Sequence, residues 1–416
     1  MRPVAMTTCW RGEAAMRILT FLHSFEPGGV ERVALRLVRQ WREVGVDAPL
    51  FVGRDDGAMR AGLGEELERH VPRQPAFSVA RFETLWMILT LPATIRRLRP
   101  DLLFCAGNSY TVVAVAMKLR LGRACPSIVA KISNDLERRD MGWPMRMAYR
   151  FWLRLQGCFI DHFVAMAPGL EREVAAYIRP GDAAITVIPN PALSLAQIDR
   201  LRSVERPVRR EADGRLFVGI GRLVRQKNFA LMIEAFAQAG GPHDQLLILG
   251  EGPDRAALGA LADRLGVASR VTLAGYVPDP ASCLGHADIF LLSSDYEGVP
   301  AVLLEALAVG LPVIATESSR AIRPLLDDGA LGRIVPAGDR HAFAAAMADA
   351  AHLTQDAQAS LAQASRFALE TASLAYLRTF AAVVAQPMGG DITPVSMAET
   401  GPTPHFPIPS TMTSSL

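Results

Sequence analysis

The sequence predicts an α/β protein made of two Rossmann-like, doubly wound domains that face a central cleft. Half of the 416 residues are hydrophobic, which is enough to build more than one sizeable core. Short apolar runs of strand length alternate with amphipathic stretches of helix length. The alternation stops at a polar, Arg-rich stretch near residue 200 and then starts again. This interruption divides the chain into two similar halves.

In the first half, the alternation predicts a parallel sheet with helices on both faces. We expect helices at 28–44, in a long stretch before Pro100, and at 109–121, 144–155 and 169–178. We expect strands at 17–25, 48–53, 101–107, 127–133, 159–167 and 185–189.

In the second half, the same pattern predicts a second parallel sheet. Its helices are expected at 228–239, 254–265, 300–309, 340–351 and 358–384. Its strands are expected at 216–221, 245–250, 270–274, 289–293, 312–315 and 332–335. Ligands of such sheets bind beyond the carboxyl ends of the strands, so two facing domains present two such edges to one cleft.

These patterns predict six segments along the chain. They are an N-terminal extension (1–15), an N-terminal Rossmann-like domain (16–192), a linker (193–214), a C-terminal Rossmann-like domain (215–370), a helix that returns to the N-terminal domain (371–385), and a disordered tail (386–416).

The composition argues against several classes of protein. The most apolar stretches, 85–93 and 111–117, are shorter than the ~20 residues that span a bilayer. The five cysteines are scattered without a Cys-x-x-Cys pair, the histidines lack metal-ligand spacing, and no Asp-x-Asp occurs. We therefore expect a cytoplasmic protein that needs no disulfide, no metal and no cofactor.

Charge is unevenly distributed along the chain. The formal net charge is +2, but residues 1–190 carry 26 Lys and Arg against 19 Asp and Glu. This excess suggests an anionic partner for the first half, either a membrane surface or a phosphorylated acceptor. The positive charges are too widely spread along the chain to indicate that the protein binds nucleic acid.

The predicted helix around 143–155 has two interpretations. Arg146, Arg150 and Arg154 are spaced four apart and form one stripe beside apolar residues. The helix either lies on the inner face of an anionic membrane or is a core helix with a solvated arginine edge. The apolar residues beside the stripe are Trp143, Met147, Phe151, Trp152 and Leu155.

Two cations follow the first strand of the second half. Arg222 stands at the strand end, and the short loop can bring Lys227 beside it. Converging cations suit a diphosphate whose charge grows as a leaving group departs. Alternatively, both are solvated loop charges, although the chain keeps only three lysines beside 41 arginines.

A second motif surrounds the predicted helix 300–309. Glu297 lies in the preceding loop, and the free N–H groups near Ala301 and Val302 form an anion site. Glu305 interrupts an otherwise apolar helix, where two ribose hydroxyls would satisfy its carboxylate. An exposed polar stripe explains Glu305 equally well.

Two further segments in the first half are weaker signals. Gly28 and Gly29 open the first helix, where they either let a phosphate approach or simply form a tight turn. Asn134 and Asp135 follow a strand end and either contact an acceptor hydroxyl or cap the next helix.

Taken together, these segments resemble the retaining glycosyltransferases of family 4, which have the GT-B fold. The resemblance covers nearly the whole chain outside the two ends. The motifs that carry it are Gly28-Gly-Val-Glu-Arg-Val33, Val187-Ile-Pro-Asn-Pro191, Gly221-Arg222 with Gln226-Lys-Asn228, Leu249-Gly-Glu-Gly252, Gly275-Tyr-Val-Pro278, and Glu297-Gly298 with Glu305-Ala-Leu-Ala-Val-Gly-Leu-Pro-Val313.

The resemblance implies a role for each matching residue. Arg222 and Lys227 would bind the donor diphosphate, Glu305 the ribose, and backbone near Val277 the base. Glu297 would lie against the transferred sugar and, with Asp135, is our candidate catalytic residue. On the acceptor side we expect His23 and Asn134. The remaining expected donor-binding residues are Gly29, Gly298, Ala301 and Val302.

The implied reaction moves a hexosyl unit from a nucleotide sugar, with UDP the expected nucleotide, to a hydroxyl of a lipid-linked or cell-surface glycan precursor. Anomeric configuration would be retained, and no metal would be needed because cations and a helix dipole take its place. Such a product belongs to lipopolysaccharide or exopolysaccharide biosynthesis.

The chain departs from the family pattern in two places. Many members have a His where this chain has the segment 131–135, and many have Gly-Gly or Gly-Pro followed by Glu where it has 317–323. These departures leave open a non-catalytic GT-B protein that binds sugar nucleotides as an assembly partner, and a sugar-nucleotide epimerase. A dehydrogenase is disfavoured because Val224 stands where the dinucleotide fingerprint has its third glycine.

Overall fold

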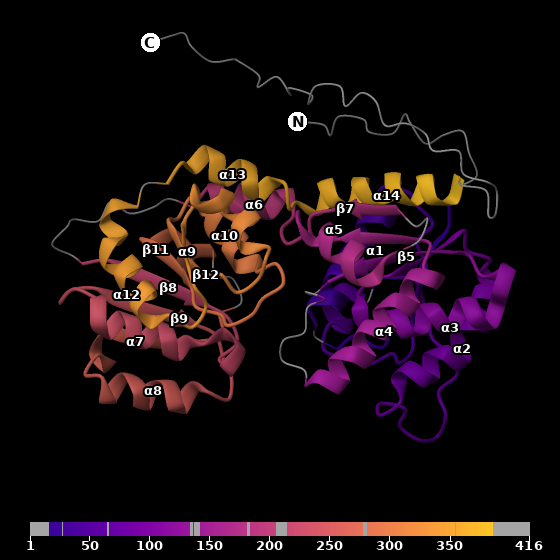
Figure 1. Cartoon of the computed structure of the whole chain (residues 1–416), viewed down its shortest axis with the longest axis horizontal. Helices are drawn as coiled ribbons and strands as arrows, with labels where there is room; N and C mark the ends of the chain where they lie inside the picture. Colours follow the sequence, from indigo (N-terminus) through magenta and orange to yellow (C-terminus); the bar gives the residue numbers. More distant parts are fainter. Residues whose placement is uncertain are drawn as a thin grey trace, which may run out of the picture.

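The computed structural model describes residues 16–26, 28–64, 66–133, 136, 142–180, 184–204, 214–277, 281–353 and 355–385. They form two α/β domains, shown side by side in Figure 1. All strand pairings in both sheets are parallel, as the alternation predicts. The extension, the tail and the predicted residues Asn134 and Asp135 lie outside the described residues.

The N-terminal sheet has the strand order β3-β2-β1-β4-β5-β6-β7. The direction in which the chain adds strands reverses between β1 and β4, which places the ligand crevice of this domain beyond the ends of these two strands. The central strands are buried and mostly apolar because helices cover both faces. The strands are β1 (Ile18–Leu22), β2 (Leu50–Val52), β3 (Arg69–His70), β4 (Leu102–Cys105), β5 (Ser127–Ile132), β6 (His162–Ala165) and β7 (Ala184–Val187).

Helices of the N-terminal domain are α1 (Gly29–Glu43), α2 (Glu83–Leu98), α3 (Thr111–Leu121), α4 (Trp143–Phe159) and the short α5 (Leu170–Glu173). Helix α3 packs against both α2 and α4, and the three helices form one layer (Figure 1). Helix α1 instead packs against the C-terminal helix α14 (Leu369–Ala385).

The C-terminal sheet has the order β10-β9-β8-β11-β12-β13, so its reversal lies between β8 and β11. Helix α7 lies between α8 and α12, and α10 packs against α13. The strands are β8 (Leu216–Ile220), β9 (Gln245–Leu249), β10 (Val271–Gly275), β11 (Ile289–Leu292), β12 (Val313–Thr316) and β13 (Arg333–Val335). The helices are α7 (Phe229–Ala239), α8 (Arg255–Arg264), α9 (Ala281–His286), α10 (Ala301–Val309), α11 (Ile322–Leu325), α12 (Arg340–Ala348) and α13 (Ala357–Ser365).

An aromatic cluster holds α14 on the N-terminal domain. Phe380 meets Trp41 of α1 and Phe104 of β4 at ring-centroid distances of 5.3 and 5.5 Å. Tyr376 adds a contact with Phe104 at 5.3 Å. All four side chains are fully buried. Burying aromatic surface of this size stabilises a helix by several kcal/mol, roughly 1.5–3 per side chain.

The crossings between the domains differ from the sequence prediction. The expected linker contains a helix, α6 (Leu195–Arg202), which begins with a capping box of Ser194 and Gln197 and buries Ile198. The single helix expected at 358–384 is broken, because α13 ends at Ser365 and α14 begins at Leu369. The N–H of Leu369 donates to the carbonyl of Leu193 at 2.7 Å. The two segments that connect the domains therefore pair with each other at a parallel bridge between Leu193 and Ala368.

Candidate functional site

The chain reversal between β8 and β11 brings two predicted site residues into direct contact. Lys227 follows β8 at the end of a 3₁₀ turn (Arg225–Lys227), and Glu297 follows β11. The Lys227 ammonium forms an ion pair with the Glu297 carboxylate, whose side chain is only 8% exposed. The Ser294 hydroxyl donates to the same carboxylate oxygen, Oε1, at 2.7 Å. A cation and a buried acid are therefore held together at the edge of the sheet where ligands bind.

Further hydrogen bonds join the two loops that carry this pair. The Ser293 hydroxyl donates to the carbonyl of Lys227 at 2.9 Å, and the amide of Asn228 donates to Asp295 at 2.7 Å. Asn228 adopts a left-handed conformation (φ 44°), which ends the turn and begins α7. These bonds fix the Lys227 backbone, and the ion pair with Glu297 holds the lysine side chain. A ligand that binds Lys227 therefore has to order little further.

Glycines allow the ends of β8 and β9 to meet closely. A Cβ on Gly250 would lie 1.9 Å from the carbonyl oxygen of Gly221, and Gly250 has φ +144°. A Cβ on Gly252 would lie 2.2 Å from the carbonyl oxygen of Leu223. The Leu-Gly-Glu-Gly motif is thus required for packing the backbone behind the site.

The other predicted donor residues follow strands of the same sheet or begin helix α10. Arg222 lies at the carboxyl end of β8 with its side chain exposed, and Val277 is half-buried just after β10. Helix α10 begins at Ala301 with Pro300 as its N-cap, one residue later than predicted. The first N–H groups of α10, at Ala301 and Val302, therefore form a positive end beside Glu297.

Glu305 lies on α10, one turn beyond these N–H groups. It is half-buried, whereas its neighbours Leu304 and Ala306 are fully buried. Burial lowers the pKa of Arg36 in α1, the charge of Arg32 lowers it further, and the negative charge of Glu305 opposes the shift. Glu305 is therefore close enough to the N-terminal domain to influence α1.

The carboxyl edge of the N-terminal sheet carries a polar network that the sequence did not indicate. The Tyr110 hydroxyl donates to Glu31 at 2.7 Å, and the ring of His23 stacks on Tyr110 with centroids 4.6 Å apart. His23 Nε2 lies 3.2 Å from the hydroxyl of Thr84. Burial lowers the pKa of His23, while Glu31 opposes this shift. His23 is thus held by groups from α1, α2 and the turn after β4.

Glu31 also explains why a glycine, Gly28, precedes α1. Its carboxylate folds back over the N-cap, because a Cβ on Gly28 would lie 1.9 Å from its Oε2 atom. A Cβ on Gly29 would meet open space, and Gly29 is exposed. Gly28 is therefore needed for local packing, whereas Gly29 remains available to a ligand.

Lys131 is buried inside the N-terminal domain, on β5. Its side chain is 2% exposed, and its ammonium donates to the Asn190 side chain at 2.5 Å. Burial lowers the pKa of Lys131 to about 7, against a smaller opposing effect of Glu31. The lysine therefore joins β5 to the segment 187–191, which leads out of the domain.

The two domains touch directly at Gly298. A Cβ at this position would lie 3.0 Å from Cε of Met166 and 3.3 Å from the carbonyl oxygen of Ser133, both in the N-terminal domain. The Ser319 hydroxyl donates to the Gly298 carbonyl at 2.9 Å. The residue next to Glu297 thus forms the contact between the donor side and the acceptor side.

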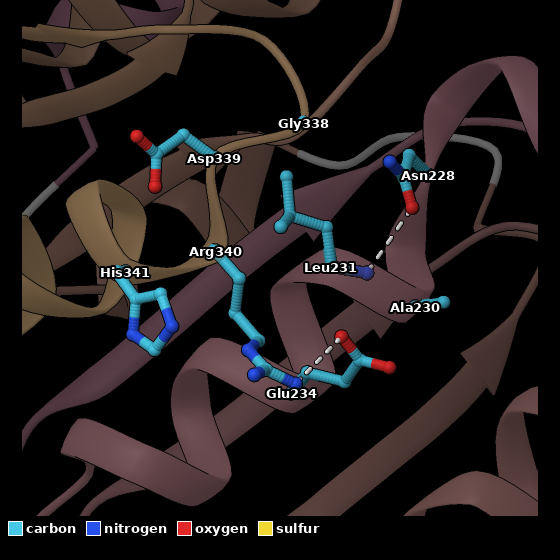
Figure 2. Close-up of a pocket in the computed structure, with 8 residues that line it drawn as sticks. All are labelled: Asn228, Ala230, Leu231, Glu234, Gly338, Asp339, Arg340 and His341. Atoms are coloured by element: carbon cyan, nitrogen blue, oxygen red, sulfur yellow. Dashed lines mark hydrogen bonds and ion pairs between the residues drawn. The ribbon is translucent and has the colours of Figure 1, made fainter.

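A separate hollow of about 520 Å³ lies between α7 and α12 (Figure 2). Its charged lining includes an ion pair between Arg340 and Glu234 at 3.7 Å, and both side chains are partly exposed. Arg222, Lys227, Glu297 and Glu305 do not line it. We therefore place the functional site at the sheet edge and not in this hollow.

Comparison with known proteins finds related sequences for both halves of the chain. The model of "Glycosyltransferase Family 4" matches residues 27–192, and the model of "Glycosyl transferases group 1" matches residues 203–366. The lipopolysaccharide core biosynthesis glycosyltransferase LpsE of Rhizobium meliloti (strain 1021) is 29% identical over 332 residues, which are 79% of this chain and 87% of LpsE.

Two solved structures share the architecture. The apo form of the lipopolysaccharide outer core galactosyltransferase WaaB has a TM-score of 0.70 at 19% identity and covers 88% of this chain and 99% of its own. Anabaena HepE in complex with UDP and glucose has a TM-score of 0.65 at 20% identity, with the same coverage. The fold is therefore GT-B, with one ligand-binding sheet edge in each domain. The chain belongs to the group 1 glycosyltransferases of family 4.

Proposed function

We propose that this glycosyltransferase moves a hexosyl unit from a UDP-sugar to a hydroxyl of a lipid-linked or cell-surface glycan precursor, with retention at the anomeric carbon. The observation that carries the proposal is the Lys227–Glu297 pair beside the N-terminus of α10. The names of LpsE and WaaB support a place in lipopolysaccharide or exopolysaccharide biosynthesis, and the HepE complex supports UDP as the nucleotide.

In this reaction the bond from the anomeric carbon to the diphosphate oxygen breaks, and a bond to the acceptor oxygen forms on the same face. The acceptor proton passes to the departing diphosphate. Negative charge grows on that diphosphate, where Lys227, Arg222 and the N–H groups of Ala301 and Val302 would stabilise it. Because these groups supply positive charge, we propose that the donor binds and reacts without a metal.

Glu297 would contact the transferred sugar. Its carboxylate is held by Ser294 and Lys227 on one oxygen, which leaves the other oxygen to accept hydrogen bonds from sugar hydroxyls. Glu305 would accept from the ribose, and backbone near Val277 would hold the base. On the opposite wall, His23 would contact the acceptor.

We also propose that α4 docks on the inner face of an anionic membrane. Trp143, Met147 and Phe151 are spaced four apart and are 69, 48 and 71% exposed, so one side of this helix presents apolar surface to solvent. Arg150 and Arg154 are exposed beside them. Apolar side chains flanked by arginines suit the boundary between headgroups and acyl chains, where a lipid-linked acceptor is found. None of the helices in the described parts of the chain has the length and apolarity needed to cross a bilayer.

The test is a thermal-shift panel of UDP, GDP, ADP and their sugar conjugates, each with and without EDTA, followed by an assay of donor hydrolysis. A shift with UDP that survives EDTA, together with release of sugar, is the expected result. A shift without sugar release would favour a non-catalytic sugar-nucleotide-binding protein. If none of the nucleotides shifts the melting temperature, the donor-site assignment is wrong.

A further inference from the structure

Glu173 is a buried acid that the proposed reaction does not use. It is the last residue of α5, which follows β6 in the N-terminal domain, and its side chain is 2% exposed. A buried carboxylate is costly unless polar partners compensate for the lost water. Both of its oxygens are in contact with such partners.

The two partners come from different domains. Oε2 accepts a hydrogen bond from the backbone N–H of Leu136 at 3.0 Å. Oε1 forms an ion pair with Nε of Arg320 at 2.7 Å. Leu136 directly follows the predicted acceptor-side residues, whereas Arg320 belongs to the C-terminal domain, between β12 and α11.

The segment that carries Arg320 is itself bonded to the donor loop. The N–H of Glu297 donates to the carbonyl of Ser318 at 3.0 Å. The hydroxyl of Ser319 donates to the carbonyl of Gly298, the residue that touches Ser133 and Met166. A continuous series of contacts therefore runs from the donor loop through Arg320 and Glu173 to Leu136.

We propose that Glu173 is a positioning residue. Arg320 of the C-terminal domain holds the Glu173 carboxylate, and this carboxylate in turn holds the backbone N–H of Leu136. The inference rests on the proposed function, because it links the donor side to the acceptor side during transfer. An ordinary structural ion pair would stabilise the protein as a whole, whereas a positioning pair changes the exchange of the Leu136 N–H in particular.

Hydrogen–deuterium exchange of peptides that include Leu136 tests this difference without any ligand. In Arg320→Ala, Glu173 still accepts the hydrogen bond from the N–H of Leu136 but loses its ion-pair partner. We expect these peptides to exchange roughly tenfold faster. Arg320→Lys should restore most of the protection. Arg333→Ala is the matched control, because Arg333 is about as exposed as Arg320 and its 3.0 Å ion pair with Asp349 lies within the C-terminal domain.

Glu173→Gln provides an independent check, since a glutamine can still accept from Leu136 but does not carry the charge that attracts Arg320. The single variants and the double variant should all exchange at about the same elevated rate, because each removes the same pair. Additive effects of the two single variants, or exchange in Arg320→Ala within twofold of wild type, would overturn the proposal. Arg320→Ala replaces a half-exposed side chain, so it keeps the test valid if Glu173→Gln does not fold.

A second measurement with UDP separates this inference from the proposed function. We expect UDP to slow exchange around Leu136 in the wild type and not in Arg320→Ala. Failure of UDP to bind the wild type counts against the donor assignment, while the ligand-free comparison still decides the role of Glu173. If UDP protects this segment equally in both proteins, Glu173 does not couple the two sides.

Discussion

The Lys227 ammonium contacts the Glu297 carboxylate, although 70 positions separate the two residues in the chain. The contact exists because β8 and β11 are neighbours in the sheet and their carboxyl ends meet at one edge. It places a positive charge where a diphosphate would depart and an acid where its sugar would lie. The pair therefore makes separate predictions for catalysis and for stability.

Replacing Lys227 by Ala should reduce kcat roughly 100-fold or more, because it removes a cation from the site of growing charge. The melting temperature should fall only modestly, since the Ser294 hydroxyl still donates to Glu297 and the lysine is 20% exposed. Turnover of the donor and thermal unfolding measure the two effects. Lys227→Arg keeps the charge and should recover part of the rate. Wild-type turnover in Lys227→Ala would show that the lysine is a solvated loop charge.

Replacing Glu305 by Ala should weaken UDP binding by about tenfold or more, because two ribose hydroxyls would lose a charged acceptor. Isothermal titration with UDP measures the affinity. Glu234→Ala, on the surface of α7, is the control because Glu234 pairs only loosely with Arg340 at 3.7 Å. An unchanged affinity together with full activity would remove Glu305 from the donor site.

Lys131 predicts how stability depends on pH. Its pKa falls from 10.5 in the unfolded chain to about 7 in the folded protein because it is buried. Between these values the unfolded chain binds more protons, so folding becomes more favourable as pH rises, by up to ~1.4 kcal/mol per pH unit from this group. Below pH 7 the Lys131 ammonium is charged in both the folded and the unfolded chain. The free-energy cost of burying it is therefore at its largest there.

Lys131→Met isolates this effect, because other groups titrate alike in both proteins. The difference in unfolding free energy between wild type and variant should shift in favour of the wild type from pH 7 to pH 9. Urea unfolding at several pH values measures it. A difference that stays constant over this range would mean that Lys131 keeps an ordinary pKa in the folded protein.

Sequence reasoning predicted the parts of the site that depend on strand order. Once Lys227 and Glu297 are placed after β8 and β11, the parallel sheet brings them together. The position of Glu173 could not be predicted in this way, because its partners meet only when the two domains touch. The same holds for the contact of Tyr110 with Glu31, which depends on how α1 packs over the end of β4.

Elsewhere the sequence contained a signal that was overlooked. Ser194 and Gln197 form the spacing of a capping box, and Ile198 and Leu201 give α6 a buried side. The high density of arginines after this helix suggested a linker for the whole stretch. A capping signal followed by spaced apolar residues is therefore better evidence than the composition of a stretch.

Replacing Arg146, Arg150 and Arg154 together by Gln should reduce binding to anionic liposomes, because each arginine near such a surface contributes about 1 kcal/mol. Three charges then correspond to a loss of roughly 100-fold in partition coefficient at low salt. Sedimentation with vesicles of phosphatidylglycerol and phosphatidylcholine measures the change.

The control is a triple variant of exposed arginines in the C-terminal domain, Arg264, Arg333 and Arg340, which removes the same charge far from α4. Long-range attraction by net charge alone would weaken binding equally in both triple variants. Docking through α4 requires a larger loss in the α4 variant, and a further loss when Trp143 and Phe151 are replaced by Ser, since these apolar side chains would enter the lipid. If vesicle binding persists unchanged in the α4 variants, the helix is a core helix with a solvated arginine edge.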